Sequence, residues 1–286
     1  MLWVEAPERS PISTTRSTMK QAGERAASAP RIFTPEYYAR MRDLESGSWW
    51  NAGMRKIAAR LLARAELPEK GSLLDAGCGS GQTLSWFLDA HSGWTATGID
   101  VAPEPLAVAR GTGLSVQRAS ALELPFASHV FDLVIALDLL QHLPLDGGDE
   151  RALREFHRVL RPDGTLLIRT NAQAYPKIRD DPVFSYRRYE PDRLRGRLAS
   201  SGFEIVVLGR SNSLLGLAEI PREMRANRSR SSSYTGLLSE PTATAGVAHF
   251  LKRTWLDIEG RAVAAGWQLP FGRTIFALCR AGRAAT

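Results

Sequence analysis

The sequence feature that most constrains the fold is a glycine-rich stretch, LLDAGCGSGQ, at residues 73–82. It follows a short apolar run and leads into QTLSWFLDA (residues 82–90), whose apolar side chains recur at helical spacing. Its glycines, Gly77, Gly79 and Gly81, allow tight turns and close approach of the backbone to a ligand. A strand, a glycine turn and a helix in this order predict a loop for a nucleotide-type cofactor, because a helix N-terminus attracts anionic groups. A purely structural turn is the alternative.

Strand and helix patterns alternate between residues 71 and 210. The run FDLVIAL (residues 131–137) is typical of a strand buried on both faces, and DERALREFHRVL (residues 149–160) has the spacing of an amphipathic helix. This alternation predicts the α/β class, with a doubly wound, mostly parallel sheet and helices on both faces. Ligands of such sheets bind at the carboxyl ends of the strands.

Changes of composition along the chain predict four segments. Residues 1–33 are rich in Ser, Thr, Pro and charged residues without periodicity, and we expect a disordered leader there. We expect an N-terminal helical lid segment at residues 34–70 and the cofactor-binding core at residues 71–210. Residues 211–286 are expected to form a helical insertion or cap, followed by the final strand of the core sheet.

The composition limits the class of protein. The 286 residues are 44% hydrophobic and 23% charged, as in globular proteins. No apolar stretch is long enough to span a membrane, the first residues lack the apolar core of a secretion signal, and there are only two cysteines, Cys78 and Cys279. These observations predict a cytoplasmic protein. The net charge is +7, but the basic residues are spread along the chain, which favours a solvated basic surface over specific nucleic-acid binding.

The strand after the glycine loop ends in an acid, Asp100. A carboxylate at this position can accept hydrogen bonds from both hydroxyls of a ribose. Gln82 stands where a dinucleotide-binding loop has its third glycine, which disfavours pyrophosphate binding. The loop and the acid together predict a nucleoside-bearing cofactor without a pyrophosphate.

Four motifs in order resemble class I S-adenosylmethionine-dependent methyltransferases of the type-11 family. They are D-x-G-x-G-x-G (residues 75–81), GIDVAPEPLAVAR (98–110), RASALELPFASHVFDLVIALDLLQHL (118–143) and LREFHRVLRPDGTLLI (153–168). The resemblance implies a Rossmann-like seven-stranded sheet and S-adenosylmethionine as the cofactor. LESGSWWNAGMRKI, SYRRYEPDRLRGRLASSGFEIV and LPFGRTIFAL resemble one group within that family, which extends the resemblance over roughly residues 35–280.

The resemblance also implies the cofactor contacts. Asp75 and the backbone of residues 77–79 lie near the amino-acid end, Asp100 binds the ribose, and Val101 lies against adenine. The family usually has Asp where Ser120 stands, so the charge of that contact is lost here. The predicted cofactor-binding residues are Asp75, Gly77, Cys78, Gly79, Gly81, Asp100, Val101, Ser120, Ala121, Leu122, Leu137 and Arg55; Cys78 is expected to be a packing residue rather than a nucleophile, and Arg55 either pairs with the methionine carboxylate or is solvated.

The candidate catalytic residues follow the fourth strand of the resemblance. Methyl transfer is a direct displacement, so a base is needed only if the acceptor must lose a proton. His142 is the first candidate base, with a histidine bonded to nearby backbone as the alternative. Asp138 is the second, with a loop anchor as the alternative. Relatives tend to have Glu-His where this chain has Gln141–His142, and His where it has Ser185, which keeps a non-catalytic cofactor-binding relative open.

The candidate acceptor-binding residues lie on either side of the core. Trp50, beside Trp49, is expected to cover the site as a lid, or to pack the N-terminal helix on the core. Arg187, Arg188 and Tyr189 are expected to grip an anionic acceptor, or to cap the following helix.

The leading function predicted is a small-molecule O-, C- or N-methyltransferase. The five histidines show no ligand spacing, so no metal is expected. After the fourth strand the chain reads DLLQHLP, not the Asn- or Asp-Pro-Pro-aromatic motif of enzymes that methylate base amino groups. An RNA or protein methyltransferase and a peripheral membrane contact through the C-terminal helices, with a lipid-like acceptor, are the alternatives.

Overall fold

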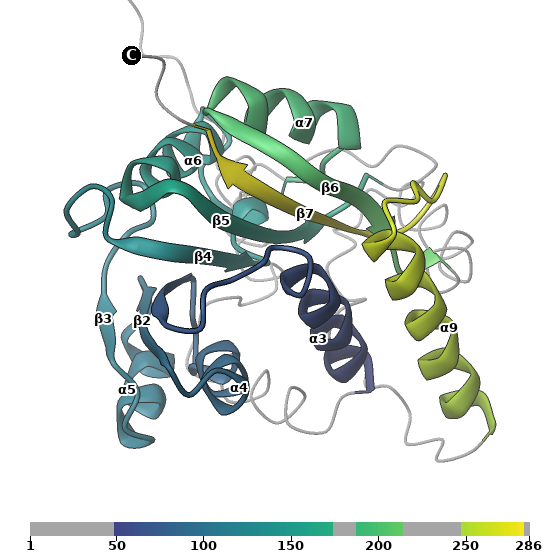
Figure 1. Cartoon of the computed structure of the whole chain (residues 1–286), viewed down its shortest axis with the longest axis horizontal. Helices are drawn as coiled ribbons and strands as arrows, with labels where there is room; N and C mark the ends of the chain where they lie inside the picture. The colour runs from purple at the N-terminus through teal and green to yellow at the C-terminus, as the bar shows by residue number, and fades with distance from the viewer. Residues whose placement is uncertain (1–48, 174–186, 214–246, 283–286) are drawn as a thin grey trace, which may run out of the picture.

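The computed structural model describes residues 49–173, 187–213 and 247–282 (Figure 1). Its centre is a seven-stranded sheet in the order β3-β2-β1-β4-β5-β7-β6. Only β7 is antiparallel to its neighbours, β5 and β6. The strands are β1 (Gly71–Ala76), β2 (Trp94–Asp100), β3 (Val116–Arg118), β4 (Phe131–Leu137), β5 (Leu160–Asn171), β6 (Phe203–Ser211) and β7 (Thr274–Ala281). The predicted α/β, Rossmann-like, mostly parallel sheet is confirmed.

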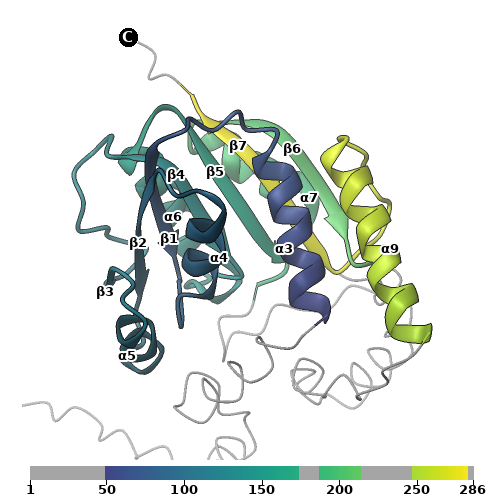
Figure 2. The same ribbon diagram turned by 60° about the horizontal axis from the view of Figure 1, so that its bottom comes forward.

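Helices cover both faces of the sheet (Figure 2). One layer holds α3 (Trp49–Leu62), α4 (Gln82–Ala90) and α9 (Val247–Ala264), and α5 (Pro103–Gly111) contributes Leu106 to the same apolar cluster. The other layer holds α6 (Gly148–Val159) and α7 (Pro191–Ser200), with Phe156 and Leu194 packed on the sheet. Both faces of β1 and β4 are therefore buried, which explains their nearly continuous apolar sequences.

The strand order reverses between β1 and β4. From β1 the chain moves outward to β2 and β3, and from β4 it moves the other way to β5. The loops that leave β1 and β4 therefore part to opposite faces, and the crevice between them is where open α/β sheets bind ligands. The glycine loop at residues 77–81 and the short 3₁₀ helix η1 (Leu140–His142) both lie at this point.

The inserted helix α9 packs closely on α3 (Figure 2). A Cβ on Gly53 would come within 2.7 Å of Leu256 Cδ1, and one on Gly260 would come within 2.8 Å of Ile57 Cγ1. Glycine at both positions thus allows the two helix backbones to approach. An ion pair of 2.6 Å between Arg60 and Asp257 supports the same contact.

Element boundaries differ from the sequence pattern at two strands. The apolar pattern at residues 114–119 contributes only three residues to β3, at the sheet edge, where one neighbour supplies all the pairing. β5 begins at Leu160, ahead of the Pro-Asp-Gly turn, because Leu160 already pairs with Phe131 across an irregular register. The predicted leader lies outside the described residues, and the division into four segments stays a prediction.

Candidate active site

The glycine loop turns back over the end of β2. The backbone N–H groups of Gly77 and Cys78 both donate to the carbonyl of Ile99, at 2.8 and 2.9 Å. Gly77, Gly79 and Gly81 have φ values of 78°, 51° and 82°, in the left-handed region that favours glycine. A Cβ placed on Gly79 would meet no atom within 4 Å, so this part of the loop borders open space.

Asp100 fastens the loop to the following helix. Its Oδ2 accepts a hydrogen bond from Gly79 N at 3.0 Å, and its Oδ1 accepts one from Ala102 N at 2.9 Å. An ionised carboxylate has about four acceptor positions. Each oxygen of Asp100 therefore keeps capacity for a hydroxyl donor beyond the two backbone bonds. Val101, the next residue, is 60% exposed, a hydrophobic surface next to the ribose position predicted for Asp100.

Asp75 lies one residue before the end of β1 and is 1% exposed. Its Oδ2 has no hydrogen-bond partner among the described residues. Burial raises the pKa of the Asp75 carboxyl to about 8, and the negative charge of Asp100 adds to the effect. A buried acceptor without a donor fits a ligand that brings a cationic N–H group, such as the ammonium of an amino acid.

The stability of the free protein should depend on pH through Asp75. The folded state raises its pKa from 3.8 to about 8, so it binds the proton more tightly than the unfolded chain does. The contribution is fully present below about pH 4 and is lost as pH rises towards 8. Between pH 5 and pH 8 we expect the melting temperature of the wild type to fall relative to that of Asp75→Asn, measured by thermal unfolding at each pH. Parallel curves for the two proteins would contradict this assignment.

Cys78 is a packing residue. Burial raises the pKa of its thiol, and the nearby Asp75 and Asp100 charges add to the rise. A Cβ on Gly98 would come within 2.6 Å of Cys78 Sγ, so the thiol fills the space above β2. The protonated, buried thiol is a poor nucleophile, as the sequence interpretation expected.

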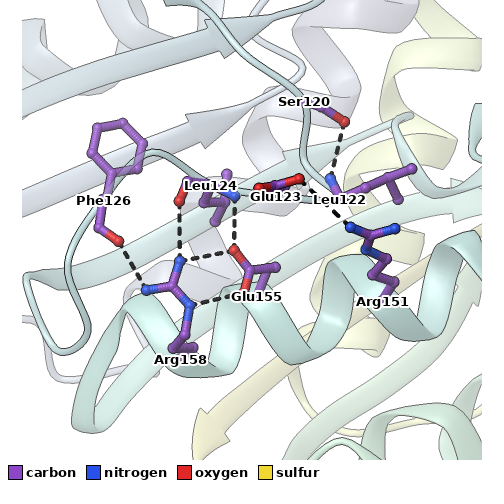
Figure 3. A network of polar contacts seen from close by, with 8 residues as sticks. All are labelled: Ser120, Leu122, Glu123, Leu124, Phe126, Arg151, Glu155 and Arg158. Atoms are coloured by element: carbon purple, nitrogen blue, oxygen red, sulfur yellow. Dashed lines mark hydrogen bonds and ion pairs between the residues drawn. The ribbon is translucent and has the colours of Figure 1, made fainter.

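Ser120, Ala121 and Leu122 lie in the loop between β3 and β4, and Figure 3 shows the first and the last of them. Leu122 N donates to Ser120 Oγ at 3.2 Å, so the hydroxyl closes the turn on itself. Ala119 N donates to Asp100 O at 3.1 Å and brings the turn beside the end of β2. The three residues predicted to surround adenine are thus next to the acid predicted to bind ribose.

Arg55 and Leu137 complete the cofactor residues predicted from the sequence. Arg55, on α3, donates to the side chain of Gln82, the first residue of α4. Its guanidinium therefore lies at the helix N-terminus that follows the glycine loop, where the methionine carboxylate is expected. Leu137, the last residue of β4, is half-buried and packs against the α3–α4 side of the core.

Asp138 is held by an arginine that the sequence reasoning missed. Arg169 on β5 donates through Nε and a terminal nitrogen to Asp138 Oδ2, and its guanidinium carbon lies 5.1 Å from the centre of the Trp50 ring. Trp50, Arg169 and Asp138 are thus in contact one after another, and they connect the start of α3 to the ends of β5 and β4. Because Asp138 is engaged by two hydrogen bonds from Arg169, the geometry supports the loop-anchor interpretation of Asp138 rather than the catalytic one. The Trp49 side chain lies outside the described residues.

His142 ends η1 at the same strand ends. Burial lowers the pKa of its imidazole to about 4, and the charge of Asp138 partly opposes that shift. The ring is therefore neutral at pH 7, the form that accepts a proton. The preceding residue, Gln141, is buried, and its Oε1 accepts from Thr170 Oγ1 at 3.0 Å and from Asn171 N at 3.2 Å, which fixes η1 against β5.

The prediction that Arg187 and Tyr189 grip an acceptor is wrong for the described structure. Both side chains are buried, at 1% and 0% exposure, on the α6 face of the sheet. Arg187 forms an ion pair of 3.1 Å with Asp149 and donates to Pro144 O at 2.8 Å, while Tyr189 OH donates to Asp149 at 2.9 Å. Their polar atoms are used inside the protein, at the N-terminus of α6. Arg188, between them, is half-buried and stays a candidate.

The described residues contain no candidate metal-ion site and no helix that could span a membrane. No group of three or more His, Cys, Asp or Glu side chains there is arranged to hold a metal ion. No helix in the described part of the chain is long and apolar enough to cross a membrane.

Comparison with known proteins agrees with this geometry. The methyltransferase domain family matches residues 74–168. Methyltransferase GfsG of Streptomyces halstedii is 34% identical over 121 residues, 40% of this chain and 42% of that protein. The tRNA (carboxymethyluridine(34)-5-O)-methyltransferase of Arabidopsis thaliana is 31% identical over 113 residues, 40% of this chain and 26% of that protein. The matched regions thus span less than half of the length of these relatives.

Solved structures show the same fold. A chain from the complex of the Haloferax volcanii Trm112 methyltransferase activator with a methyltransferase superposes with a TM-score of 0.57 at 19% identity, over 90% of this chain and all of that chain. Phosphoethanolamine N-methyltransferase 2 of Haemonchus contortus, solved with S-adenosylmethionine, superposes with a TM-score of 0.57 at 16% identity, over 89% of this chain and 59% of that chain. Residues 74–168 therefore form a methyltransferase domain of the type-11 family of class I S-adenosylmethionine-dependent methyltransferases.

Proposed function

We propose that the chain transfers a methyl group from S-adenosylmethionine to a small-molecule acceptor by direct displacement. The observation that carries the proposal is the pair of carboxylates at the ends of β1 and β2. Asp75 presents a buried oxygen without a donor, and Asp100 presents two oxygens with spare acceptor capacity beside open space at Gly79. One suits an ammonium group and the other a ribose, and both lie at the carboxyl ends of the adjacent strands β1 and β2, beside the crevice between β1 and β4.

Bound S-adenosylmethionine supplies an electrophilic methyl group on a sulfonium sulfur. The protein has to orient the two reactants in line and exclude water, and orientation alone supplies a large part of such an acceleration. Arg55 on α3, whose side chain reaches the start of α4, would hold the carboxylate end of the cofactor. The turn at residues 120–122 would hold the adenine end. His142, neutral and next to the strand ends, would take the proton of an acceptor that has to lose one.

The ion pairs limit which arginines could bind an anionic acceptor. Arg187 is buried with Asp149, and Arg169 is paired with Asp138, so neither offers an unpaired positive charge to an anion. This weakens the expectation of an anionic acceptor. Trp50, whose ring stacks on Arg169 at the ends of β4 and β5, remains the aromatic candidate for contact with the acceptor.

Nucleic acid is the second candidate acceptor, because tRNA methyltransferases are among the relatives of this chain. The sequence prediction of no specific nucleic-acid partner therefore has no support from the comparisons. Binding to tRNA at two salt concentrations separates the candidates, since contact with several phosphates makes affinity fall steeply with salt.

A membrane contact through α9 stays a prediction. Phe250, Leu251, Trp255 and Ile258 on this helix are between 40% and 69% exposed. Flotation with anionic liposomes, with and without residues 212–268, tests it. We also propose a cytoplasmic location, because Cys78 and Cys279 are both free thiols.

The test of the proposed function is turnover. The protein is incubated with S-adenosylmethionine, and formation of S-adenosylhomocysteine is followed with and without a fractionated extract of small molecules, and with total tRNA. Acceptor-dependent turnover with a small-molecule fraction supports the proposal. Cofactor binding without turnover on any fraction would indicate the non-catalytic relative, and turnover on tRNA would replace the small-molecule acceptor.

His142→Gln should lower kcat by about 100-fold or more when the acceptor loses a proton, since general-base catalysis contributes about 10²–10⁴-fold. Cofactor affinity should stay the same, because His142 is not among the residues predicted to contact the cofactor. With a pKa near 4, the wild type should show no loss of kcat between pH 7 and pH 5.5. His91→Gln is the matched control, because His91 stacks on Phe87 at the end of α4, at the opposite edge of the sheet. An unchanged kcat in His142→Gln would show that no base acts at this position.

A further inference from the structure

Two side chains on α6, Glu155 and Arg158, hold the loop between β3 and β4 from the side away from the cofactor residues (Figure 3). Glu155 Oε2 accepts a hydrogen bond from Leu124 N at 2.7 Å. Arg158 donates to the carbonyls of Phe126 at 2.8 Å and Leu124 at 3.1 Å. Two further bonds of 2.8 Å join the guanidinium to the carboxylate. The pair therefore binds three backbone groups of the loop at once.

The loop needs these partners because it has few of its own. Leu124 is 5% exposed and lies in neither a helix nor a strand. Buried backbone N–H and C=O groups must find hydrogen bonds inside the protein. Hydrogen bonds to charged groups are stronger than those between neutral groups. Arginine suits this position because its planar guanidinium serves two carbonyls and a carboxylate together.

The clamped segment is continuous with the turn predicted to surround adenine. Ser120 O accepts from Glu123 N at 3.2 Å and Ser120 Oγ accepts from Leu122 N at 3.2 Å, so residues 120–123 form a closed unit. Ala119 N attaches one end of this unit to Asp100 O, and Glu155 attaches the other end through Leu124. The turn is thus held at both ends, by the end of β2 on one side and by α6 on the other.

We infer that Glu155 and Arg158 are positioning residues for adenine recognition. Neither reaches the strand ends, and both act through the backbone of Leu124 and Phe126. By fixing the turn before the cofactor arrives, they remove the entropy cost of ordering it on binding. The inference rests on the proposed use of an adenosine-bearing cofactor.

The test compares two ligands that differ only in the base. S-adenosylhomocysteine carries the adenine amino group, and S-inosylhomocysteine carries an oxo group in its place. In Glu155→Gln and Arg158→Lys we expect the Kd of S-adenosylhomocysteine to rise about 10-fold, with a much smaller change for S-inosylhomocysteine. The preference for adenine should therefore shrink, while kcat at saturating cofactor stays the same. Arg151→Ala is the matched control, because its exposed ion pair with Glu123 joins the same helix to the same loop without binding backbone.

Hydrogen exchange supplies a second measurement on the same proteins. The Leu124 amide should exchange faster in both variants, with β1 and β2 unchanged. The inference would be overturned if the ratio of the two Kd values equalled that of the wild type, whether neither Kd changed or both rose by the same factor. Glu155 and Arg158 would then have only a general structural role. A wild type that binds neither ligand would instead overturn the proposed function. If one variant fails to fold, the other carries the test.

Discussion

Asp100→Ala is expected to weaken S-adenosylmethionine binding about 100-fold or more. The Asp100 carboxylate would lose two hydrogen bonds to the ribose hydroxyls, and hydrogen bonds to charged groups contribute about 1.5–3 kcal/mol each. It would also lose its bonds to Gly79 N and Ala102 N, which hold the glycine loop in place. Isothermal titration calorimetry measures the change directly.

The control for Asp100 lies at the other end of the sheet. Asp132 also accepts a backbone hydrogen bond, from Ser72 N at 2.8 Å, near the start of β1. Asp132→Ala should lower stability without changing the Kd of the cofactor. If Asp100→Ala bound the cofactor as the wild type does, the assignment of this carboxylate to the ribose, and with it the cofactor site, would be wrong.

Arg187→Ala is expected to destabilise the fold by about 3 kcal/mol or more, without a specific effect on acceptor binding. Removing one partner of a buried ion pair leaves an uncompensated charge in the core, at a cost of about 3–5 kcal/mol. Among the described residues, Asp149, at 0% exposure, would keep only Arg197 at 3.7 Å and the Tyr189 hydroxyl. Urea unfolding measures the loss.

Two variants test the origin of that loss. Arg151→Ala, which breaks an exposed ion pair on the same helix, should cost less than about 1 kcal/mol. The double variant Arg187→Met/Asp149→Leu should recover part of the stability, since it removes both charges. A stable Arg187→Ala with a raised KM for the acceptor would restore the acceptor interpretation that the buried geometry contradicts.

The parts of this protein that the sequence predicts well are those encoded within one segment. The glycine positions with positive φ, the helix that begins at Gln82 and the acid at the end of β2 all lie between residues 77 and 100. Short-range spacing reports the backbone geometry directly, because only glycine readily takes the left-handed conformations at Gly77, Gly79 and Gly81. The alternation of strand and helix patterns likewise predicts the doubly wound sheet.

The roles of the charged side chains were decided by contacts between distant segments. Arg187 reads as an exposed arginine in a polar stretch, yet it bonds to Pro144, 43 residues earlier, because the segment before α7 crosses the start of α6. Arg169 looks like an ordinary strand residue, but it faces Asp138 and Trp50 from two other elements. Nothing in the local pattern distinguishes a paired arginine from a free one.

The sequence by itself therefore predicted the fold class and a nucleoside-bearing cofactor, since both depend on backbone conformations and periodicities that a short stretch of residues specifies. The methyl donor followed from the resemblance of four motifs to a known family. The tertiary structure alone decided which polar side chains are bonded to other groups inside the protein and which lie at the strand ends. The free energy of a charge depends on what surrounds it, and those surroundings, from α3, α6 and the ends of β4 and β5, are assembled only when the chain folds.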